Sequence, residues 1–559
     1  MSRLPRVAGE GRGRSIALVA VLALGQAGAA GMAAFATRDV FAAFRDDAVS
    51  LPVLALAMVA AAGLAIALFR VFERVVAERV GQNYAASLRL KLFAHLTEMS
   101  ARDVADRRSG GLAMRFVGDL AAVRGWVSLG IARLISASIV LPAATAVLFL
   151  LDPRLGVAAA VPIAVGLAVM ALAGPRLGPA HKRLRARRAR LAADMSERIP
   201  HAPELRLLGR IRTEKAHLLR RTEKLIASAL ARARGAALLR AVPDAVSGIA
   251  AASLFAAALT LGVAAPEAAG AMAAVGLIIQ PMRDLAGVWD RHRAWVAARD
   301  KCDALLAAPT LKRRHKAARK PLADAPQPLR FTGVSAGALK DVEIEAPARR
   351  KIAIVGGNGA GKSTLLSLAA GLEQPEKGKV SLGGRAPSSL SAAERRRMIA
   401  LVGTRSPILA GSLRRALTMG SAEQLGDDAV AAKAEAFGLG DVMERLGGLD
   451  GRLAEGGRNL SAGEIRRVLL TRAALSGSRL MLLDEPDDAL DVDGPALVER
   501  LVRKCDATTL MITHNLALAR RMDEIWFVED GRVVEVGPPE EVFSGSGPAA
   551  RFFAPRWAA

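Results

Sequence analysis

The stretch KIAIVGGNGAGKS, residues 351–363, decides the fold of the second half of the chain. The apolar run KIAIV predicts a buried strand, and it leads into the pattern G-x-x-x-x-G-K-[ST] in the strand–loop–helix setting that this pattern requires. Glycines here let backbone N–H groups close around a phosphate at a helix N-terminus. Lys362 is expected to reach the β- and γ-phosphates, and Ser363 to hold Mg²⁺. The predicted phosphate loop consists of Gly356, Gly357, Asn358, Gly359, Ala360, Gly361, Lys362 and Ser363.

A second motif, LMLLDE at residues 480–485, follows the loop by about 120 residues. Its apolar residues predict a buried strand that ends in two acids. Asp484 suits Mg²⁺, usually through water, and Glu485 is placed to polarise the water that attacks a γ-phosphate. Such a strand is weak support by itself. When the strand follows a phosphate loop in the sequence, the two motifs together indicate a nucleotide-hydrolysing site. They also disfavour the alternative that residues 356–361 are a chance glycine-rich turn.

The first half of the chain contains six apolar runs, most of them long enough to cross the ~30 Å of membrane hydrocarbon as helices. They cover residues 15–36, 51–69, 134–151, 155–172, 245–264 and, in a shorter run, 268–282. The first and second, third and fourth, and fifth and sixth runs are separated by only a few residues, and the other two gaps hold roughly sixty to seventy. This spacing predicts six spans with short outer turns and long helical extensions.

Charge gives the expected orientation. The formal charge is +25, and the basic residues gather beside the apolar runs or in HKRLRARRAR, whereas the turn VAAPEAAG has none. Positive charge favours the cytoplasmic side, so the N-terminus, both long gaps and the C-terminal half are expected there, in a multi-pass protein of the cytoplasmic (inner) membrane. Arg133, before the third span, is expected to snorkel to the membrane boundary. A cleaved secretory signal peptide is the alternative explanation of the first run.

Two other classes of protein are disfavoured. Nucleic-acid binding by stacking needs aromatic residues among basic ones, and the chain has a single tyrosine, Tyr84, with no such interleaving. Cys302 and Cys505 are far apart, so neither a disulfide framework nor a zinc site is predicted.

Three further motifs complete an ordered set. GRNLSAGEIRR lies between the phosphate loop and the two acids, and DDALD and LMITHN follow them. The set resembles the ATPase domain of an ATP-binding cassette (ABC) transporter. The spans, with RRSGGLAMRFVGDL after the second and HAPELRLLGRIRTEKAH after the fourth, resemble a type IV (exporter-fold) half-transporter. The resemblance covers nearly the whole chain.

The resemblance implies a multidomain fold, in which an all-α transmembrane domain of six helices precedes an α/β P-loop NTPase domain. We expect the transmembrane domain over residues 1–304, a linker over 305–328, the ATP-binding domain over 329–541 and a C-terminal tail over 542–559. Segments near 103–111 and 201–209 resemble the short coupling helices that press on the ATPase domains in this family.

The resemblance also implies residue roles for ATP and Mg²⁺. Thr364 would join Lys362 and Ser363 on the phosphates and metal, with Asp484 supporting the metal. Glu485 would be the general base, and His514 would contact the γ-phosphate and position the water.

The signature LSAGE implies a partner. Ser461 and Gly463 would face a γ-phosphate bound by a second subunit, because each site in this family lies between one subunit's phosphate loop and the other's signature. The chain is therefore expected to act as a dimer, embedded in membrane lipid, with no nucleic-acid partner.

Three positions depart from the family pattern. Thr404 stands where a glutamine usually contacts Mg²⁺ and the attacking water. GVSAGALKDV, residues 333–342, lacks the aromatic ring usually found beneath adenine, and its loss would weaken nucleotide binding by roughly 5- to 150-fold unless something replaces it. Ala462 replaces a glycine of the signature and adds a methyl group near the other subunit's nucleotide.

Two functions fit these observations. The first is an ATP-driven exporter half that moves a solute or lipid outward as a dimer. The second is a nucleotide-binding, weakly hydrolysing regulatory half of a heterodimer. Intact Lys362, Glu485 and His514 favour the first, whereas Thr404, the missing ring and Ala462 favour the second and lead us to favour a heterodimer. The sequence does not identify the transported substrate.

Overall fold

The structure is a computed structural model that describes residues 4–45, 51–107, 112, 115–311 and 322–553. The chain divides into two compact units, Met1–Thr97 with Arg107–Ala308, and Glu98–Asp106 with Pro309–Ala559. Parts of three expected segments, at 108–111 of the first coupling segment, 312–321 of the linker and 554–559 of the tail, lie outside the described residues.

The first unit is helical. Six segments of the described chain are long and apolar enough to cross a membrane, which confirms the predicted six spans, including the short sixth run. Its main helices are α1 (Arg12–Arg45), α2 (Val53–Thr97), the short α5 (Leu120–Trp126), α6 (Ala132–Leu151), α7 (Pro153–Ala173), α8 (Gly178–Arg198), α10 (Ile211–Thr260), α11 (Ala265–Ala286) and α12 (Val288–Leu306). Shorter turns are η1 (Arg115–Asp119), η2 (Val127–Ile131), η3 (Gly174–Leu177), η4 (Ile199–His201) and α9 (Ala202–Leu207).

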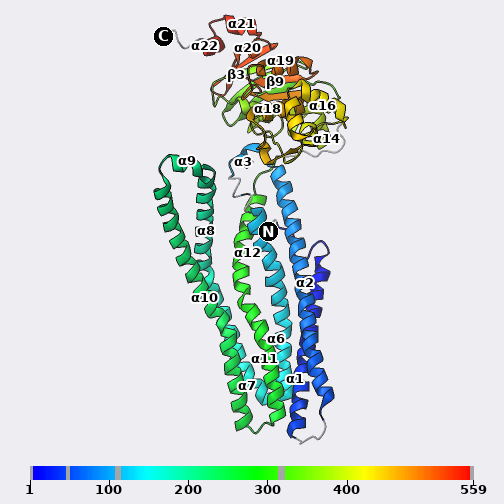
Figure 1. Cartoon of the computed structure of the whole chain (residues 1–559), viewed down its shortest axis with the longest axis vertical. Helices are drawn as coiled ribbons and strands as arrows, with labels where there is room; N and C mark the ends of the chain where they lie inside the picture. The colour runs from blue at the N-terminus through cyan, green and yellow to red at the C-terminus, as the bar shows by residue number, and fades with distance from the viewer. Residues whose placement is uncertain (1–3, 46–50, 108–111, 113–114, 312–321, 554–559) are drawn as a thin grey trace. The chain divides into compact units, whose positions relative to one another are not determined.

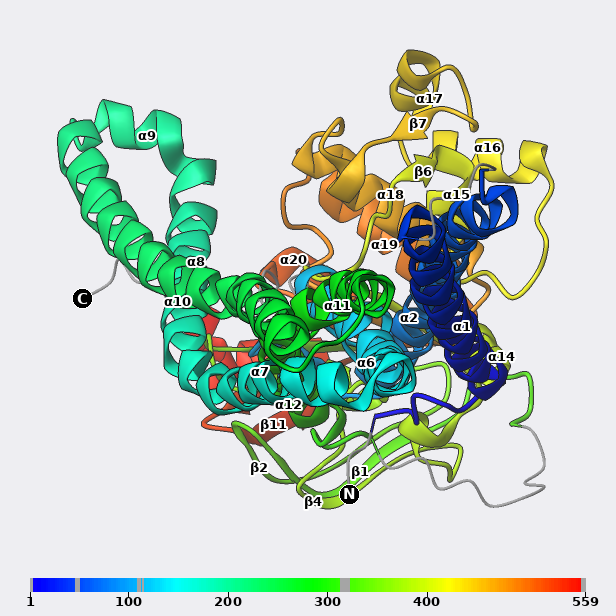
Figure 2. The ribbon, with the colours of Figure 1, turned by 90° about the horizontal axis from the view of Figure 1, so that it is seen from below.

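Small residues let these helices approach closely. In Figures 1 and 2, α1 runs beside α2, and α7, α10 and α11 lie together. A Cβ atom added to Gly166 of α7 would lie 2.3 Å from a methyl carbon of Val246 on α10, so only glycine fits this crossing. The turn between α6 and α7 is fixed by Asp152, which accepts a hydrogen bond from the Arg154 N–H at 2.7 Å as the N-cap of α7.

The second unit is an α/β domain, as predicted, built around a six-stranded sheet in the order β11-β10-β3-β9-β8-β5. All neighbours in this sheet are parallel except β10 and β11. Its strands are β3 (Lys351–Gly356), β5 (Ile399–Val402), β8 (Leu480–Asp484), β9 (Thr508–Ile512), β10 (Glu524–Glu529) and β11 (Arg532–Gly537). β1 (Leu329–Ala336), β2 (Leu339–Ala346) and β4 (Lys377–Leu382) form an antiparallel sheet, and β6 (Gly411–Ser412) pairs with β7 (Arg452–Leu453).

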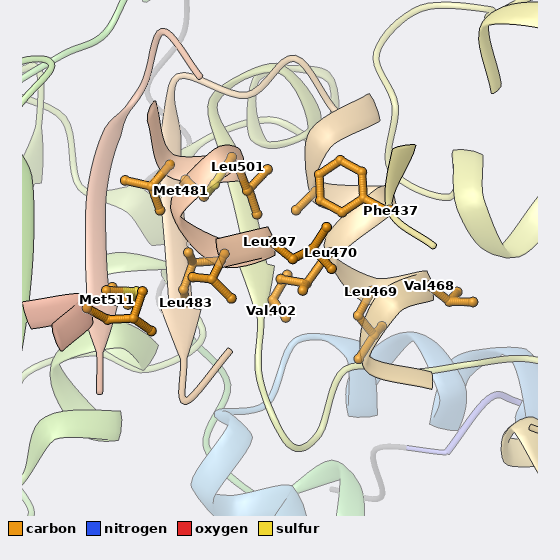
Figure 3. Close-up of a cluster of buried hydrophobic side chains, with 14 of the residues drawn as sticks. Val402, Phe437, Val468, Leu469, Leu470, Met481, Leu483, Leu497, Leu501 and Met511 are labelled. Carbon is orange, nitrogen blue, oxygen red and sulfur yellow. The ribbon is translucent and has the colours of Figure 1, made fainter. Parts of the chain in front are cut away.

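Helices cover this sheet and bury two apolar cores. The helices of this unit are α3 (Ala101–Ala105), α13 (Lys362–Ala369), α14 (Ala392–Met398), α15 (Leu413–Thr418), α16 (Asp427–Ala436), α17 (Gly440–Leu446), α18 (Ala462–Leu475), α19 (Gly494–Lys504), α20 (Leu516–Ala519), α21 (Pro539–Ser544) and α22 (Pro548–Phe553). Figure 3 shows one core, in which Leu470 of α18 and Leu497 of α19 face Leu483 of β8. The phosphate loop follows β3, Asp484 ends β8, and His514 follows β9, which lies between them. The sheet order therefore gathers these segments at the carboxyl ends of three adjacent strands.

Candidate functional site

The phosphate loop has a backbone that only glycine fits at two positions. Gly356 has φ 149°, and a Cβ atom there would lie 2.1 Å from the Val528 carbonyl oxygen. Gly361 has φ 104°, and its Cβ would lie 2.5 Å from a methyl carbon of Leu339. Because β10 and the β1–β2 turn press on the loop at these glycines, its path into α13 is fixed.

Lys362 points back into the loop from the first turn of α13. Its Nζ donates hydrogen bonds to the carbonyl oxygens of Gly356 and Gly357, each at 2.8 Å, and the residue is 7% exposed. Burial lowers the pKa of Lys362, and the charges of Glu485 and Asp484 oppose that effect. The ammonium group is therefore held inside the loop, where an anionic phosphate would relieve the cost of burying it.

Ser363 and Asp484 meet at the start of α13 and the end of β8. The Ser363 hydroxyl donates to Asp484 Oδ1 at 3.4 Å, and burial raises the pKa of Asp484. A hydroxyl and a carboxylate are hard oxygen ligands that fit Mg²⁺. The described residues contain no group of three or more His, Cys, Asp or Glu that could hold a metal, so Mg²⁺ bound here would take its other ligands from phosphate and water.

Glu485 and His514 form the next pair along the same edge. His514 Nε2 lies 3.3 Å from Glu485 Oε1, and the side chains are 40% and 39% exposed. Glu485 has φ 51°, and its N–H donates to the Ile512 carbonyl at 3.0 Å. A non-glycine residue with positive φ costs about 1–3 kcal/mol and is common at functional sites. Here that backbone turns the carboxylate toward His514. The ring of Phe552, on α22, lies 6.3 Å from the imidazole ring.

The signature residues lie at the start of α18. Ser461 is its N-cap and accepts from the Glu464 N–H at 3.2 Å, while Glu464 accepts from the Ser461 N–H at 2.8 Å. A Cβ on Gly463 would lie 3.1 Å from the Ala489 carbonyl oxygen. Within the described chain, no hydrogen bond or ion pair joins Ser461 or Gly463 to the group around Lys362. The structure thus brings together Lys362, Ser363, Asp484, Glu485 and His514, and it does not bring the signature to them.

Two of the departures from the family pattern lie at this edge. Thr404 is exposed, two residues beyond β5, which pairs with β8 up to Val402 and Leu483. At the turn that lacks an aromatic ring, an Arg102 nitrogen lies 2.4 Å from where a Cβ on Gly337 would stand. The Arg102 side chain therefore fills the space beside this turn.

Sequence reasoning missed Arg102. It lies on α3, whose N-cap Ser100 accepts from the Asp103 N–H at 3.0 Å, and the Ala101 N–H donates to the Leu372 carbonyl at 2.9 Å. Glu376, which accepts from the Gly337 N–H at 3.3 Å, lies 3.7 Å from the Arg102 guanidinium. The predicted coupling segment 103–111 gave a signal for a short helix, but no local pattern pointed to its partners.

Known proteins resemble both halves of the chain. Residues 339–488 match the family described as "ABC transporter", and residues 16–266 match "ABC transporter transmembrane region". The mycobactin import ATP-binding/permease protein IrtB of Mycolicibacterium thermoresistibile is 33% identical over 301 residues, which are 53% of this chain and 52% of that relative. The β-(1→2)glucan export ATP-binding/permease protein NdvA of Rhizobium meliloti is 36% identical over 217 residues, 38% of this chain and 37% of the relative. The chain thus aligns with about half, or less, of these relatives' lengths.

A solved structure matches over nearly the full length. The structure of a bacterial Atm1-family ABC exporter with ATP bound has a TM-score of 0.81, covers 98% of both chains and is 20% identical. At that identity the match shows the fold alone. With both family matches, the six candidate spans and the ordered strand-end motifs, it leads to one conclusion: the chain belongs to the ABC transporters and carries a transmembrane domain fused to an ATP-binding domain, as in a half-transporter.

Proposed function

We propose that the chain is one half of a dimeric exporter that uses Mg-ATP to move a solute or lipid outward across the cytoplasmic membrane. The observation that carries this proposal is the pairing of Glu485 with His514 beside the Ser363–Asp484 contact. This edge offers a base, a metal-compatible pair of oxygens and a buried ammonium within one domain. The names of similar proteins include both import and export, so the proposed outward direction rests on the exporter fold.

The chemistry assigned to these residues is electrostatic. Lys362 and the loop N–H groups would neutralise the phosphates, and Ser363 and Asp484 would hold Mg²⁺, which supplies further charge neutralisation when bound. Glu485 would polarise the attacking water and accept its proton. His514, beside that carboxylate, would contact the γ-phosphate and position the water. Ser461 and Gly463, on the exposed start of α18, would complete the site of a second half-transporter. ATP would thereby close two ATPase domains and re-orient the long helices.

The test compares two variants of the full chain in lipid nanodiscs. Lys362→Ala should lose binding of a fluorescent ATP analogue, whereas Glu485→Gln should keep binding and lose hydrolysis by about 10²- to 10⁴-fold. Glu455→Gln is the matched control, because Glu455 is an exposed acid whose side chain pairs only with Arg458 in the described structure. Turnover of Glu485→Gln at the level of this control would overturn the assigned base.

A second candidate function is the regulatory half of a heterodimer, which binds ATP and hydrolyses it slowly. Exposed Thr404, the turn without a ring at Gly337 and Ala462 on α18 favour it. The chain should then hydrolyse slowly alone and fast only with a different half-transporter. Robust turnover by a stable dimer of this chain alone would rule that candidate out.

A further inference from the structure

A cavity of about 200 Å³ lies within the transmembrane unit, lined by α1, α2, η2, α6 and α11. Its walls are unusually polar for such a bundle. Arg70, Glu73 and Arg74 come from α2, and Arg133 comes from α6. From α1, η2, α6 and α11 come Gln26, Ser128, Ser136, Gln280 and Asp284.

These polar residues share one level in the bundle. At a rise of 1.5 Å per residue, Gln26 lies roughly 27–30 Å along α1 from its end at Arg45. Glu73 lies at a similar distance along α2 from its start at Val53. Arg133 and Asp284 lie equally far from the ends of α6 and α11, at Leu151 and Ala265. That distance is about one thickness of membrane hydrocarbon.

The backbone is irregular on two sides of the cavity. Ser128 and Leu129 belong to η2, a π-helical turn, and such turns are frequent at functional sites. Pro281 lies within α11 and lacks an N–H, so the Leu277 carbonyl loses its usual helical donor. Irregular backbone at membrane depth is tolerated where it lines a cavity.

Two polar residues of the cavity lining are buried. Ser128 is 2% exposed, and its Oγ has no hydrogen-bond partner in the described structure. Gln26 is 7% exposed and donates to Glu73. The Ser128 Oγ itself is covered by protein atoms, so Ser128 belongs to the wall of the cavity and is not a donor that an occupant reaches.

The acids of the cavity already have donors. Glu73 accepts from Gln26 and, at 3.3 Å, from Ser136, and Asp284 pairs with Arg133 and accepts from Gln280 at 3.2 Å. Arg133 therefore has an ion-pair partner on α11, and its expected snorkelling to the membrane boundary stays a prediction.

The remaining donors are cationic. Arg70 has no hydrogen bond or ion pair with any described residue, and Arg74 has only a 3.5 Å contact with Glu78. The lining thus holds three guanidinium groups and two carboxylates, and Glu78, outside the lining, offsets part of the charge of Arg74.

We propose that this cavity binds an oxyanion group, a carboxylate or phosphate, of the transported molecule, through Arg70 and Arg74. The proposal rests on the proposed transport function and narrows its substrate class. A volume of about 200 Å³ fits such a head group rather than a whole lipid. The group belongs to a small soluble anion or to the head of an anionic lipid, and the experiment separates these sources.

The test measures thermal stability of the full chain in nanodiscs, in a Lys362→Ala background so that the phosphate loop does not contribute. In phosphatidylcholine discs, inorganic phosphate and glutamate are titrated as soluble oxyanions. In a second arm, phosphatidylglycerol discs without added anion present the lipid source. The variant is the double substitution Arg70→Gln with Arg74→Gln. Arg79→Gln, an exposed arginine of α2 that does not line the cavity, is the matched control.

One of the two arms should raise the unfolding temperature of the parent chain and of Arg79→Gln. The double arginine variant should lower apparent affinity by about 10-fold or more, because the charge-assisted hydrogen bonds to the oxyanion are lost. If neither arm distinguishes the double variant from Arg79→Gln, the cavity holds only water and the proposal fails. The transport function is tested separately, by nucleotide binding to the chain that keeps Lys362.

Discussion

The Arg102 guanidinium donates to Glu373 Oε2 at 3.1 Å and so attaches helix α3 to the loop that follows α13 of the ATPase domain. The two residues are 271 positions apart in the sequence. Burial raises the pKa of Glu373, and Arg102 offsets part of that effect. Because Arg102 also lies against the Gly337 turn, one side chain links α3, the phosphate-loop helix and the β1–β2 turn.

Replacing Arg102 with glutamine should loosen α3. The ion pair is partly exposed, at 40% for Arg102 and 12% for Glu373. Its loss should lower the free energy of local opening of α3 by about 1 kcal/mol, which reduces the protection of its amides from hydrogen exchange roughly 5-fold. Hydrogen exchange of the amides of residues 101–105 in the full chain measures this. Lys379→Gln, on the exposed side of β4, is the control. Unchanged exchange in Arg102→Gln would show that the Ala101–Leu372 backbone contact alone holds the helix.

The Arg385–Glu394 pair should make stability depend on acid pH. The hydrogen bond from Arg385 and, against burial, those from Ser391 lower the pKa of Glu394 to about 2. A lowered pKa stabilises the folded state above the ordinary value of 4.5, and this contribution disappears as the pH falls toward about 2. Arg385→Gln should therefore reduce the free energy of unfolding at pH 7 by about 1–3 kcal/mol. Below pH 4.5 the stability of this variant should fall less steeply with pH than that of the parent chain. Thermal unfolding of the full chain across this range, with exposed Arg396→Gln as control, checks both effects; parallel curves for the two variants would contradict the assignment.

Thr404→Gln should raise ATP hydrolysis. The threonine hydroxyl is too short to reach both metal and water, whereas a glutamine amide beyond β5 would extend toward Asp484. We expect a gain of roughly 10-fold at saturating Mg-ATP, less than the 10²–10³-fold effect of a preorganised catalytic donor. Thr404→Val, which keeps the size and removes the hydroxyl, is the control. Equal rates for the two variants would mean that this position does not limit turnover.

Labelling of introduced cysteines tests the orientation. Ala264→Cys, in the exposed turn before α11, should react with a membrane-impermeant maleimide added outside intact cells, and Arg188→Cys, on α8, should react only after lysis. Native Cys302 is buried, and half-buried Cys505 is replaced by serine in both variants. The opposite pattern would invert the proposed topology.

The sequence predicts what is local or periodic, and little of what joins distant segments. The phosphate loop, the strand ending at Asp484 and the six apolar spans are recognisable because glycine spacing, a strand followed by acids and run length are short-range signals. The contacts between Arg133 and Asp284, 151 positions apart, and between Arg102 and Glu373 depend on helix packing that no local pattern encodes. The sequence does not predict the π-helical turn η2 either, because VSLGI has the composition of an ordinary helix.

The position of Ser461, which no contact within the described chain joins to Lys362, has a genetic consequence. If two chains share each nucleotide site, an inactive chain removes activity from every dimer it enters. A Glu485→Gln allele expressed beside the normal one should then behave as a dominant negative. In a homodimer formed at random from equal amounts of the two chains, about one dimer in four would be fully normal. In an obligate heterodimer, half of the complexes would stay normal, so the dose response of such an allele would reveal the composition of the transporter without purifying it.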